Sequence, residues 1–218
     1  ADHMSLFPSL TPTYIDKLVG EALSMEAATA HDAGALGFMA RAFLQATLPH
    51  RKVEGNEFER RNGAFTLSLL APSKIGLPYG SIPRLLLAWL TTEAVRTHNR
   101  ELELGDTLSA FMRELDLVPT GGRWGSITRL KNQAGRLFAS TVSASYTGTD
   151  RHAEAGYRVA DQSLLWWDAK APDQAGLWKS RVVLTEAFYR EVTERPVPID
   201  MRAIRALKKS PMALDLYA

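Results

Sequence analysis

The chain has 218 residues, of which 45% are hydrophobic and 23% charged, a composition that is ordinary for a globular protein and excludes a disordered chain. The formal net charge is only +2, so bulk charge does not indicate a polyanionic partner. The absence of cysteine excludes disulfides, thiolate catalysis and cysteine-bound metal, and it fits a reducing cytoplasm. No apolar run is long enough to span a membrane.

Two helices and a hairpin are expected in the first third of the chain. Residues 14–25 have apolar side chains at helical spacing, and residues 35–47 repeat that pattern. The period then changes to two over residues 56–70, where Asn62-Gly63 separates two strand-like runs. Asn-Gly predicts a hairpin, because a type I′ turn needs positive φ at both central positions.

The middle of the chain predicts helix, strand, helix, turn and helix. The helix over residues 83–97 is apolar almost all round, so we expect it to be buried at the centre of the fold. A brief strand at 102–104 precedes a one-sided helix over 106–115. A glycine-rich turn at 121–125 then leads to a helix over 126–138.

Strands return after this helix. Residues 141–146 and 157–167 have strand-like patterns joined by a polar loop at 147–154, and a further strand is expected over 178–184. Helix, strand, helix, helix and a strand pair with a basic tip is the order of a winged helix. The predicted fold class is therefore α+β, a winged helix with extra N-terminal helices and a β-hairpin. Since strands and helices do not alternate regularly, a parallel α/β sheet fits less well.

The helix over 126–138 is divided into two faces. Apolar residues fall at helical spacing on one side, and they are Ile127, Leu130, Ala134, Leu137 and Phe138. The other side carries four polar residues, Arg129, Asn132, Gln133 and Arg136. Arginine pairs with guanine, and asparagine and glutamine pair with adenine, in the major groove of DNA. These four side chains are therefore candidate readers of base edges.

Five further residues complete the candidate DNA-binding set. We expect phosphate contacts from Arg123 in the turn, from Ser126, which caps the helix, from Lys131, and from Arg151 in the wing-like loop, and we add Thr128 to the set. Free N–H groups at the start of a helix favour a phosphate there. The alternative is a solvated surface helix, which would carry the same residue types outward.

The charge is unevenly distributed along the chain. Residues 121–158 hold six Lys or Arg against two Asp or Glu, and residues 195–209 hold five against one, so each segment has a net charge of +4. The second segment ends in Lys208 and Lys209, which suit a solvated helix end or an additional phosphate contact. We expect Trp124 to anchor the turn on the core, with stacking on a sugar or base as the alternative.

Signals for an enzyme are poor. The five histidines lie far apart and none forms a His-x-His pair or another metal-ligand spacing. The glycine turn lacks the lysine of a nucleotide-binding loop, and no Gly-x-Ser-x-Gly elbow occurs. We therefore expect no catalytic residue, no metal and no cofactor.

Several short segments resemble the RepA-type replication initiators of broad-host-range bacterial plasmids. Each is a modest signal, but their order is specific to that family. The matching segments lie at 37–42, 45–50, 60–63, 75–80, 85–96, 102–106, 111–115, 119–124 and 211–217.

This resemblance implies a winged-helix protein of the bacterial cytoplasm that binds repeated sites in double-stranded plasmid origin DNA. It implies recruitment of host replication initiation and helicase proteins. It also implies a homodimer in the absence of origin DNA, which represses the protein's own promoter. Rolling-circle initiators nick DNA with a tyrosine and a metal held by a His-x-His pair, so the missing pair predicts no nuclease activity.

The resemblance also guides the division into domains. We expect a tag remnant and flexible N-terminus over 1–10, because its start lacks the apolar stretch of a signal peptide. N-terminal helices and the hairpin should occupy 11–76, packed on a winged-helix DNA-binding domain over 77–209. Residues 210–218 should begin a truncated linker helix to a second winged-helix domain.

Two other functions remain open from the residues alone. A winged-helix transcriptional repressor without a role in replication would use the same helix. A protein-interaction scaffold could instead present the basic face to an acidic partner.

Overall fold

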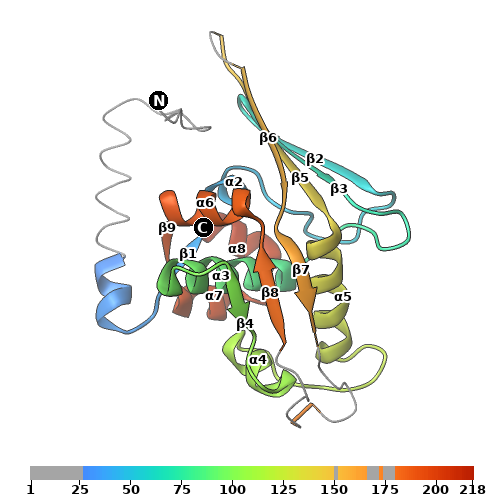
Figure 1. Cartoon of the computed structure of the whole chain (residues 1–218), viewed down its shortest axis with the longest axis vertical. Helices are drawn as coiled ribbons and strands as arrows, with labels where there is room; N and C mark the ends of the chain where they lie inside the picture. The colour runs from blue at the N-terminus through green and yellow to red at the C-terminus, as the bar shows by residue number, and fades with distance from the viewer. Residues whose placement is uncertain (1–26, 150–151, 166–171, 174–179) are drawn as a thin grey trace.

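Helix α3 (Ser81–Thr97) lies at the centre of the molecule, with sheets and helices packed around it (Figure 1). The six consecutive residues from Leu85 to Leu90 are all buried. Six consecutive helical positions point to all sides of the helix axis, so α3 is enclosed all round. The expectation of a buried central helix is confirmed. The computed structural model describes residues 27–149, 152–165, 172–173 and 180–218, and the expected helix over 14–25 lies outside them.

The predicted hairpin is present and belongs to a larger sheet. Strand β2 (Glu57–Asn62) pairs antiparallel with β3 (Phe65–Leu70), which leaves Gly63 and Ala64 as the two-residue turn. Of these two residues only Gly63 has positive φ. The expected type I′ turn is therefore wrong, because that turn needs positive φ at both positions and type II′ needs it only at the first.

Two more strands complete this sheet, in the order β2-β3-β5-β6. Strands β5 (Thr141–Thr147) and β6 (His152–Arg158) pair antiparallel up to Thr147 opposite His152. Residue 147 and residues 152–154, which were expected in the polar loop, are therefore strand. In Figure 1 this hairpin extends away from α3.

The helix expected over residues 35–47 is wrong in its first half. Strand β1 (Leu36–Met39) pairs antiparallel with β9 (Val197–Asp200), and only the short helix α2 (Arg41–Gln45) follows it. Glycine at position 37 has a low helix propensity. It also permits close packing, because a Cβ there would lie 2.5 Å from the Met201 sulfur.

A second sheet combines strands that flank the predicted basic helix in the sequence. Its order is β4-β8-β7, all antiparallel. The chain order around it is α3, β4 (Glu101–Glu103), α4 (Leu108–Glu114), α5 (Ser126–Ala139), β7 (Ala160–Leu164) and β8 (Arg181–Leu184). The hairpin β5–β6 interrupts this order between α5 and β7. The single strand expected over 157–167 is thus divided, because the buried Val159 separates β6 from β7.

The C-terminal helices pack against α3. After α6 (Glu186–Glu194) and β9 come α7 (Met201–Leu207) and α8 (Pro211–Tyr217). One hydrophobic core joins these helices to α2, β3 and α5. Within the described residues, therefore, the segments expected as separate parts share sheets and core. No helix in the described part of the chain is long and apolar enough to cross a bilayer.

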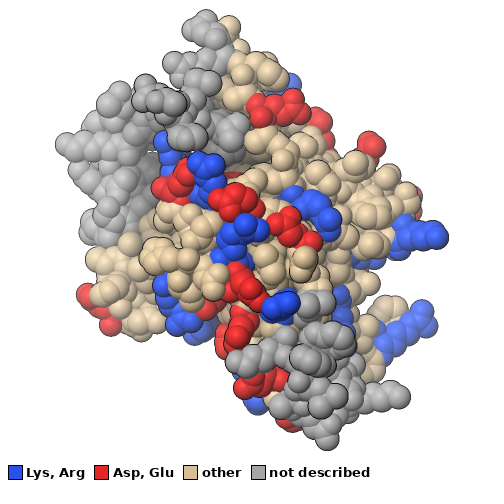
Figure 2. Space-filling model, in the orientation of Figure 1, with Lys and Arg blue, Asp and Glu red and all other residues tan. Residues whose placement is uncertain are grey.

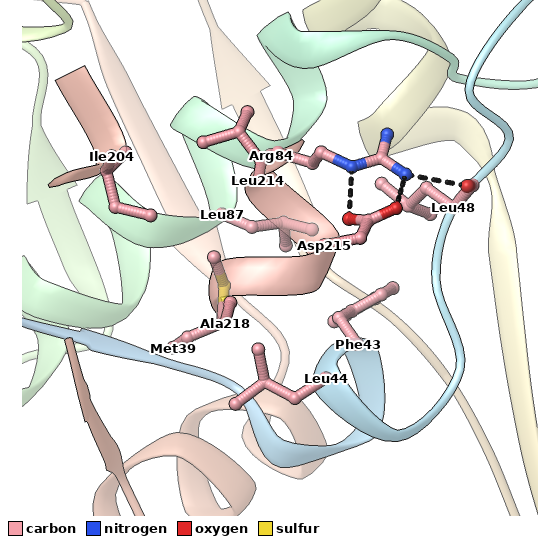
Figure 3. A pocket seen from close by; sticks show the side chains of 10 residues that line it. All are labelled: Met39, Phe43, Leu44, Leu48, Arg84, Leu87, Ile204, Leu214, Asp215 and Ala218. Atoms are coloured by element: carbon pink, nitrogen blue, oxygen red, sulfur yellow. Dashed lines mark hydrogen bonds and ion pairs between the residues drawn. The ribbon is translucent and has the colours of Figure 1, made fainter. Parts of the chain in front are cut away.

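A cluster of polar groups around the buried Arg84 side chain helps to attach helix α8. The Arg84 Nε and Nη2 donate to the two Asp215 carboxylate oxygens at 2.6 and 2.5 Å. His50 Nε2 lies 2.7 Å from Asp215 Oδ2. Figure 3 shows Arg84 and Asp215 beside an apolar cavity of about 20 Å³ that Leu214 helps to line. This volume holds about one water-sized sphere, so the cavity is a packing gap and no ligand site.

Candidate nucleic-acid interface

Helix α5 presents the two faces that the sequence predicts. Its five apolar residues, Ile127, Leu130, Ala134, Leu137 and Phe138, are all buried. Arg129 and Asn132 are exposed on the opposite side. The expected bounds of this helix and the burial of its apolar face are confirmed.

Gln133 does not join the exposed face. Its side chain is only 5% exposed, and its Oε1 accepts a hydrogen bond of 2.9 Å from the Tyr79 backbone N–H. Position 133 lies three residues after Leu130 and four before Leu137, so it stays on the core side of the helix. The expectation that Gln133 projects outward with the other three is wrong.

Arg136 is half-buried and held in place. Its Nη1 donates to the Leu77 carbonyl at 3.1 Å, and its guanidinium lies 5.6 Å from the centroid of the Tyr79 ring. Its Nε donates to Asn132 Oδ1 at 2.7 Å. Arg136 therefore orients Asn132, whose amide nitrogen keeps its donors for a ligand.

Ser126 has a structural role in the turn before α5. Its hydroxyl donates to the Val118 carbonyl at 2.6 Å and accepts from the Thr120 N–H at 2.9 Å, and its side chain is buried. The N-cap residue is Gly125, where an added Cβ would lie 2.2 Å from the Thr120 carbonyl oxygen. The turn is tight, and the Ser126 hydroxyl makes its hydrogen bonds inside it. The expectation that Ser126 caps the helix and contacts a phosphate from an exposed position is therefore wrong.

The end of this turn is exposed. Trp124 is 80% exposed, and the Arg123 guanidinium lies 5.1 Å from the centroid of its ring. The expectation that Trp124 anchors the turn on the core is wrong, because the Ser126 hydrogen bonds and Leu117, which packs against the core, hold the turn instead.

The remaining predicted residues differ in placement. Thr128 is exposed, and its hydroxyl donates to the Gly122 carbonyl at 2.9 Å. Lys131 is half-buried on α5. Arg151 lies outside the described residues.

A groove of about 730 Å³ lies along the polar face of α5. Its far side is formed by the loop after α2 and by the end of α7. The seven Lys and Arg that line it are Arg51, Lys52, Arg123, Arg129, Arg136, Lys208 and Lys209. No Asp or Glu lines the groove among the described residues. By contrast, the face in Figure 2 mixes acidic and basic side chains.

Four of these cations were not among the predicted site residues. Lys208 and Lys209 end the second basic segment, so the sequence carried a signal for them. Arg51-Lys52 is only a basic pair after proline and histidine, and nothing in the local sequence joins it to α5. Lys208 contacts the Asp116 carboxylate, whereas Arg51, Lys52 and Lys209 have no ion-pair partner within the described residues.

Ionisable groups outside the groove offer no metal site. Burial raises the pKa of the Glu191 carboxyl and raises that of the Tyr157 hydroxyl well above its ordinary value, and both groups lie where α6 meets β6. Among the described residues, no three His, Asp or Glu side chains come together as potential metal ligands. The seven cations that line the groove suit it to binding a polyanion.

A family model described as "Plasmid encoded RepA protein" matches residues 77–218. The chain belongs to this family. The match covers α3, α4, α5 and every later element, and it includes most of the groove's lining. It confirms the family that the sequence resembles, a family of plasmid replication proteins.

Solved structures give a more distant likeness. A crystal structure of RctB domains 2 and 3 has a TM-score of 0.48 and 10% identity, covering 71% of this RepA-family chain and 59% of the RctB chain. A selenomethionine derivative of the same domains has a TM-score of 0.48 and 8% identity, covering 78% and 65%. The chain thus spans less than two thirds of each RctB chain. No curated protein sequence gives a significant match.

Proposed function

We propose that the chain initiates plasmid replication by binding double-stranded origin DNA sequence-specifically through α5. The groove carries this proposal, because the described residues line it with seven cations and no carboxylate and because Arg129 and Asn132 stand exposed on one helix face. Lysine and arginine supply the sequence-independent attraction to phosphates. Exposed guanidinium and carboxamide groups supply the contacts that distinguish bases.

The chain order supports a winged helix built around α5. In α3, β4, α4, α5, β7 and β8, the short first strand β4 pairs beside the later two, in the sheet order β4-β8-β7. On this proposal α4 and α5 form the helix-turn-helix, with α5 in the major groove. On this proposal the strand pair β7–β8 takes the place that the sequence suggested for β5 and β6.

Family membership supports the wider role. We propose that origin repeats are the DNA sites, that the protein represses its own promoter as a homodimer, and that it contacts host initiation and helicase proteins. Arg123, Lys131 and Arg151 are proposed to contact phosphates, and Thr128 is proposed to contact the same DNA. All of these act in the bacterial cytoplasm, where plasmid DNA resides.

Selection of bound sequences from random duplex DNA tests the proposal. We expect enrichment of one short motif, with direct repeats of it in the plasmid origin. An enriched inverted repeat together with failure of the full gene to maintain an origin plasmid would favour a repressor. Equal binding of all duplexes would contradict sequence-specific recognition.

A further inference from the structure

The groove has a second wall that faces the polar side of α5. Arg51 and Lys52, from the loop after α2, and Lys208 and Lys209, from the end of α7, form this second wall. The four residues come from segments more than 150 positions apart in the sequence. Arg51, Lys52 and Lys209 are exposed, and within the described residues none of these three has a salt-bridge partner.

The second wall is held in position by Arg84 of α3. Besides Asp215, the Arg84 guanidinium donates to the Leu48 carbonyl at 2.7 Å, the Gly80 carbonyl at 2.7 Å and the Pro49 carbonyl at 3.3 Å. Leu48 and Pro49 directly precede the loop that carries Arg51, and Asp215 lies in the helix that follows Lys209. Figure 3 shows the Arg84 guanidinium between Asp215 and the Leu48 carbonyl. One buried side chain therefore ties the segments next to both halves of the second wall to the start of α3.

A wall fixed in this way meets a ligand with little loss of conformational entropy in its backbone. Its chemistry is that of point charges on flexible stems, with one guanidinium and three ammonium groups. Lysine binds phosphate as a point charge and carries little geometric information. The second wall is thus suited to a regular line of phosphates and poorly suited to reading bases.

The size of the groove limits which part of a nucleic acid can enter it. A volume of about 730 Å³ is far too small for a duplex, so only the edge of a DNA strand can enter it. When a helix lies in the major groove, which is about 12 Å wide, phosphate backbones run along both sides of it. The second wall lies beside α5, where such a backbone would pass.

We propose that the second wall holds the phosphodiester backbone of the duplex that α5 reads, on one flank of the major groove. This proposal rests on the proposed duplex binding and adds the residues that set the position of α5 on it. Contacts of this kind fix register and carry no direct sequence information. Their loss should weaken binding to every duplex by the same factor.

The test compares Arg51→Ala/Lys52→Ala with a matched pair, Arg60→Ala/Arg61→Ala. The matched pair removes the same charge from strand β2, which lines no part of the groove. Each variant is titrated with the selected duplex and with a random duplex at several salt concentrations. Thermal unfolding of each variant confirms that it is folded.

Loss of two phosphate contacts should reduce the slope of log K against log salt by about 1.8. Between 50 and 200 mM salt the parent should therefore lose about twelvefold more affinity than Arg51→Ala/Lys52→Ala. The ratio of selected to random affinity should stay unchanged in that variant. The matched pair should behave as the parent does.

Asp116→Asn offers a gain-of-function arm. Asp116 has φ of 55°, a conformation that asparagine tolerates, and its carboxylate contacts Lys208. The substitution removes the negative charge beside Lys208, whose Nζ still donates to the backbone carbonyl of residue 116. The groove therefore gains one net positive charge, and we expect tighter binding to both duplexes and a steeper salt slope.

The outcomes separate this proposal from the proposed function. If the parent selects a motif but Arg51→Ala/Lys52→Ala keeps the parent's salt slope, the second wall is no backbone site and α5 alone binds the duplex. A change in the selected-to-random ratio would show base reading and would also overturn the proposal. If the parent binds no duplex, both proposals fail together.

Discussion

Two arginines on neighbouring helices show how this fold divides its cations between structure and ligand. Arg84 of α3 is buried, and its guanidinium meets a carboxylate and three backbone carbonyls. Arg129 of α5 is exposed, and its side chain has no hydrogen-bond or ion-pair partner within the described residues. A buried charge is costly unless it is fully paired, so Arg84 is committed to the fold. Arg129 keeps its donors for a partner outside the chain.

The comparison extends to whole regions. Around Arg84, every charge has an opposite charge or an oriented carbonyl nearby, and Leu48, Gly80 and Asp215 are held together from distant parts of the sequence. Along the polar face of α5, cations collect, and no carboxylate from the described part of the chain lines the groove there. The first region specifies the fold, and the second creates a field that attracts phosphates.

The largest effect is expected from breaking the Arg84 cluster. Asp215→Ala leaves a buried guanidinium without its carboxylate and should lower the free energy of unfolding by about 3 kcal/mol. Chemical denaturation measures this loss. Glu194→Ala, which removes the exposed partner of Arg190, is the control and should cost less than about 0.5 kcal/mol. Equal losses of unfolding free energy in both variants would show that the Arg84 cluster stabilises the fold no more than an exposed ion pair does.

The next largest effect is expected on duplex binding and comes from the exposed arginine of the comparison, Arg129. Arg129→Ala should weaken binding to the selected duplex by about 2 kcal/mol and relax the preference for one base pair, because its fork can pair with guanine. Titration with the selected duplex and its single-base variants measures both changes. Unfolding should be unaffected, since the Arg129 side chain has no partner to lose. Unchanged specificity would remove Arg129 from the base-reading set.

A smaller loss of stability is expected from Gln133, the polar residue that α5 buries. Gln133→Ala removes the acceptor of the Tyr79 N–H and should lower the free energy of unfolding by about 1.5 kcal/mol. The matched control is Arg129→Ala, which changes an exposed position of the same helix. If Gln133→Ala instead altered specificity without any loss of stability, Gln133 would be a base reader after all.

The smallest effect depends on pH and comes from the start of α7, the helix that ends at the second wall. The hydrogen bond from the Arg202 side chain, together with that from the Arg202 N–H, lowers the pKa of the Asp200 carboxyl. A lowered pKa means that the carboxylate stabilises the fold at neutral pH and that this contribution disappears as pH falls through the lowered pKa.

Asp200→Asn keeps a capping side chain but removes the charge at the helix start, so it should cost about 0.5 kcal/mol at pH 7. Unfolding curves recorded from pH 7 down to pH 3 should show the parent and variant converging below about pH 4, the ordinary range for aspartate. A gap that stays constant over this range would exclude the carboxylate charge as its cause.

The sequence predicts the parts of this fold that local patterns determine. The burial of α3 follows from its continuous apolar run, and both the bounds and the apolar face of α5 follow from helical spacing. The hairpin β2–β3 follows from a turn signal between alternating runs. In each case the deciding residues lie within about a dozen positions of one another.

The sequence-based predictions miss features that depend on contacts with segments distant in the sequence. Residues 36–39 form a strand because β9, about 160 positions later, pairs with them and Met201 packs on Gly37. Helical spacing alone places Gln133 on the core side, but its buried hydrogen-bond partner, the Tyr79 N–H, lies 54 positions earlier in the chain. The second wall combines segments from the two ends of the described chain, and Arg84 bonds to Leu48 beside one and to Asp215 beside the other. No helical or strand period encodes such meetings.

Methylation interference on the selected duplex tests most directly whether α5 reads the major groove. Arginine recognises guanine through O6 and N7, so methylation of N7 at one guanine should block binding of the parent. The account predicts that Arg129→Ala binds the methylated and unmethylated duplexes equally well, because the contact is already lost. If methylation at every guanine affected the parent and Arg129→Ala alike, Arg129 would not lie in the major groove, and the assignment of α5 as the reading helix would be contradicted.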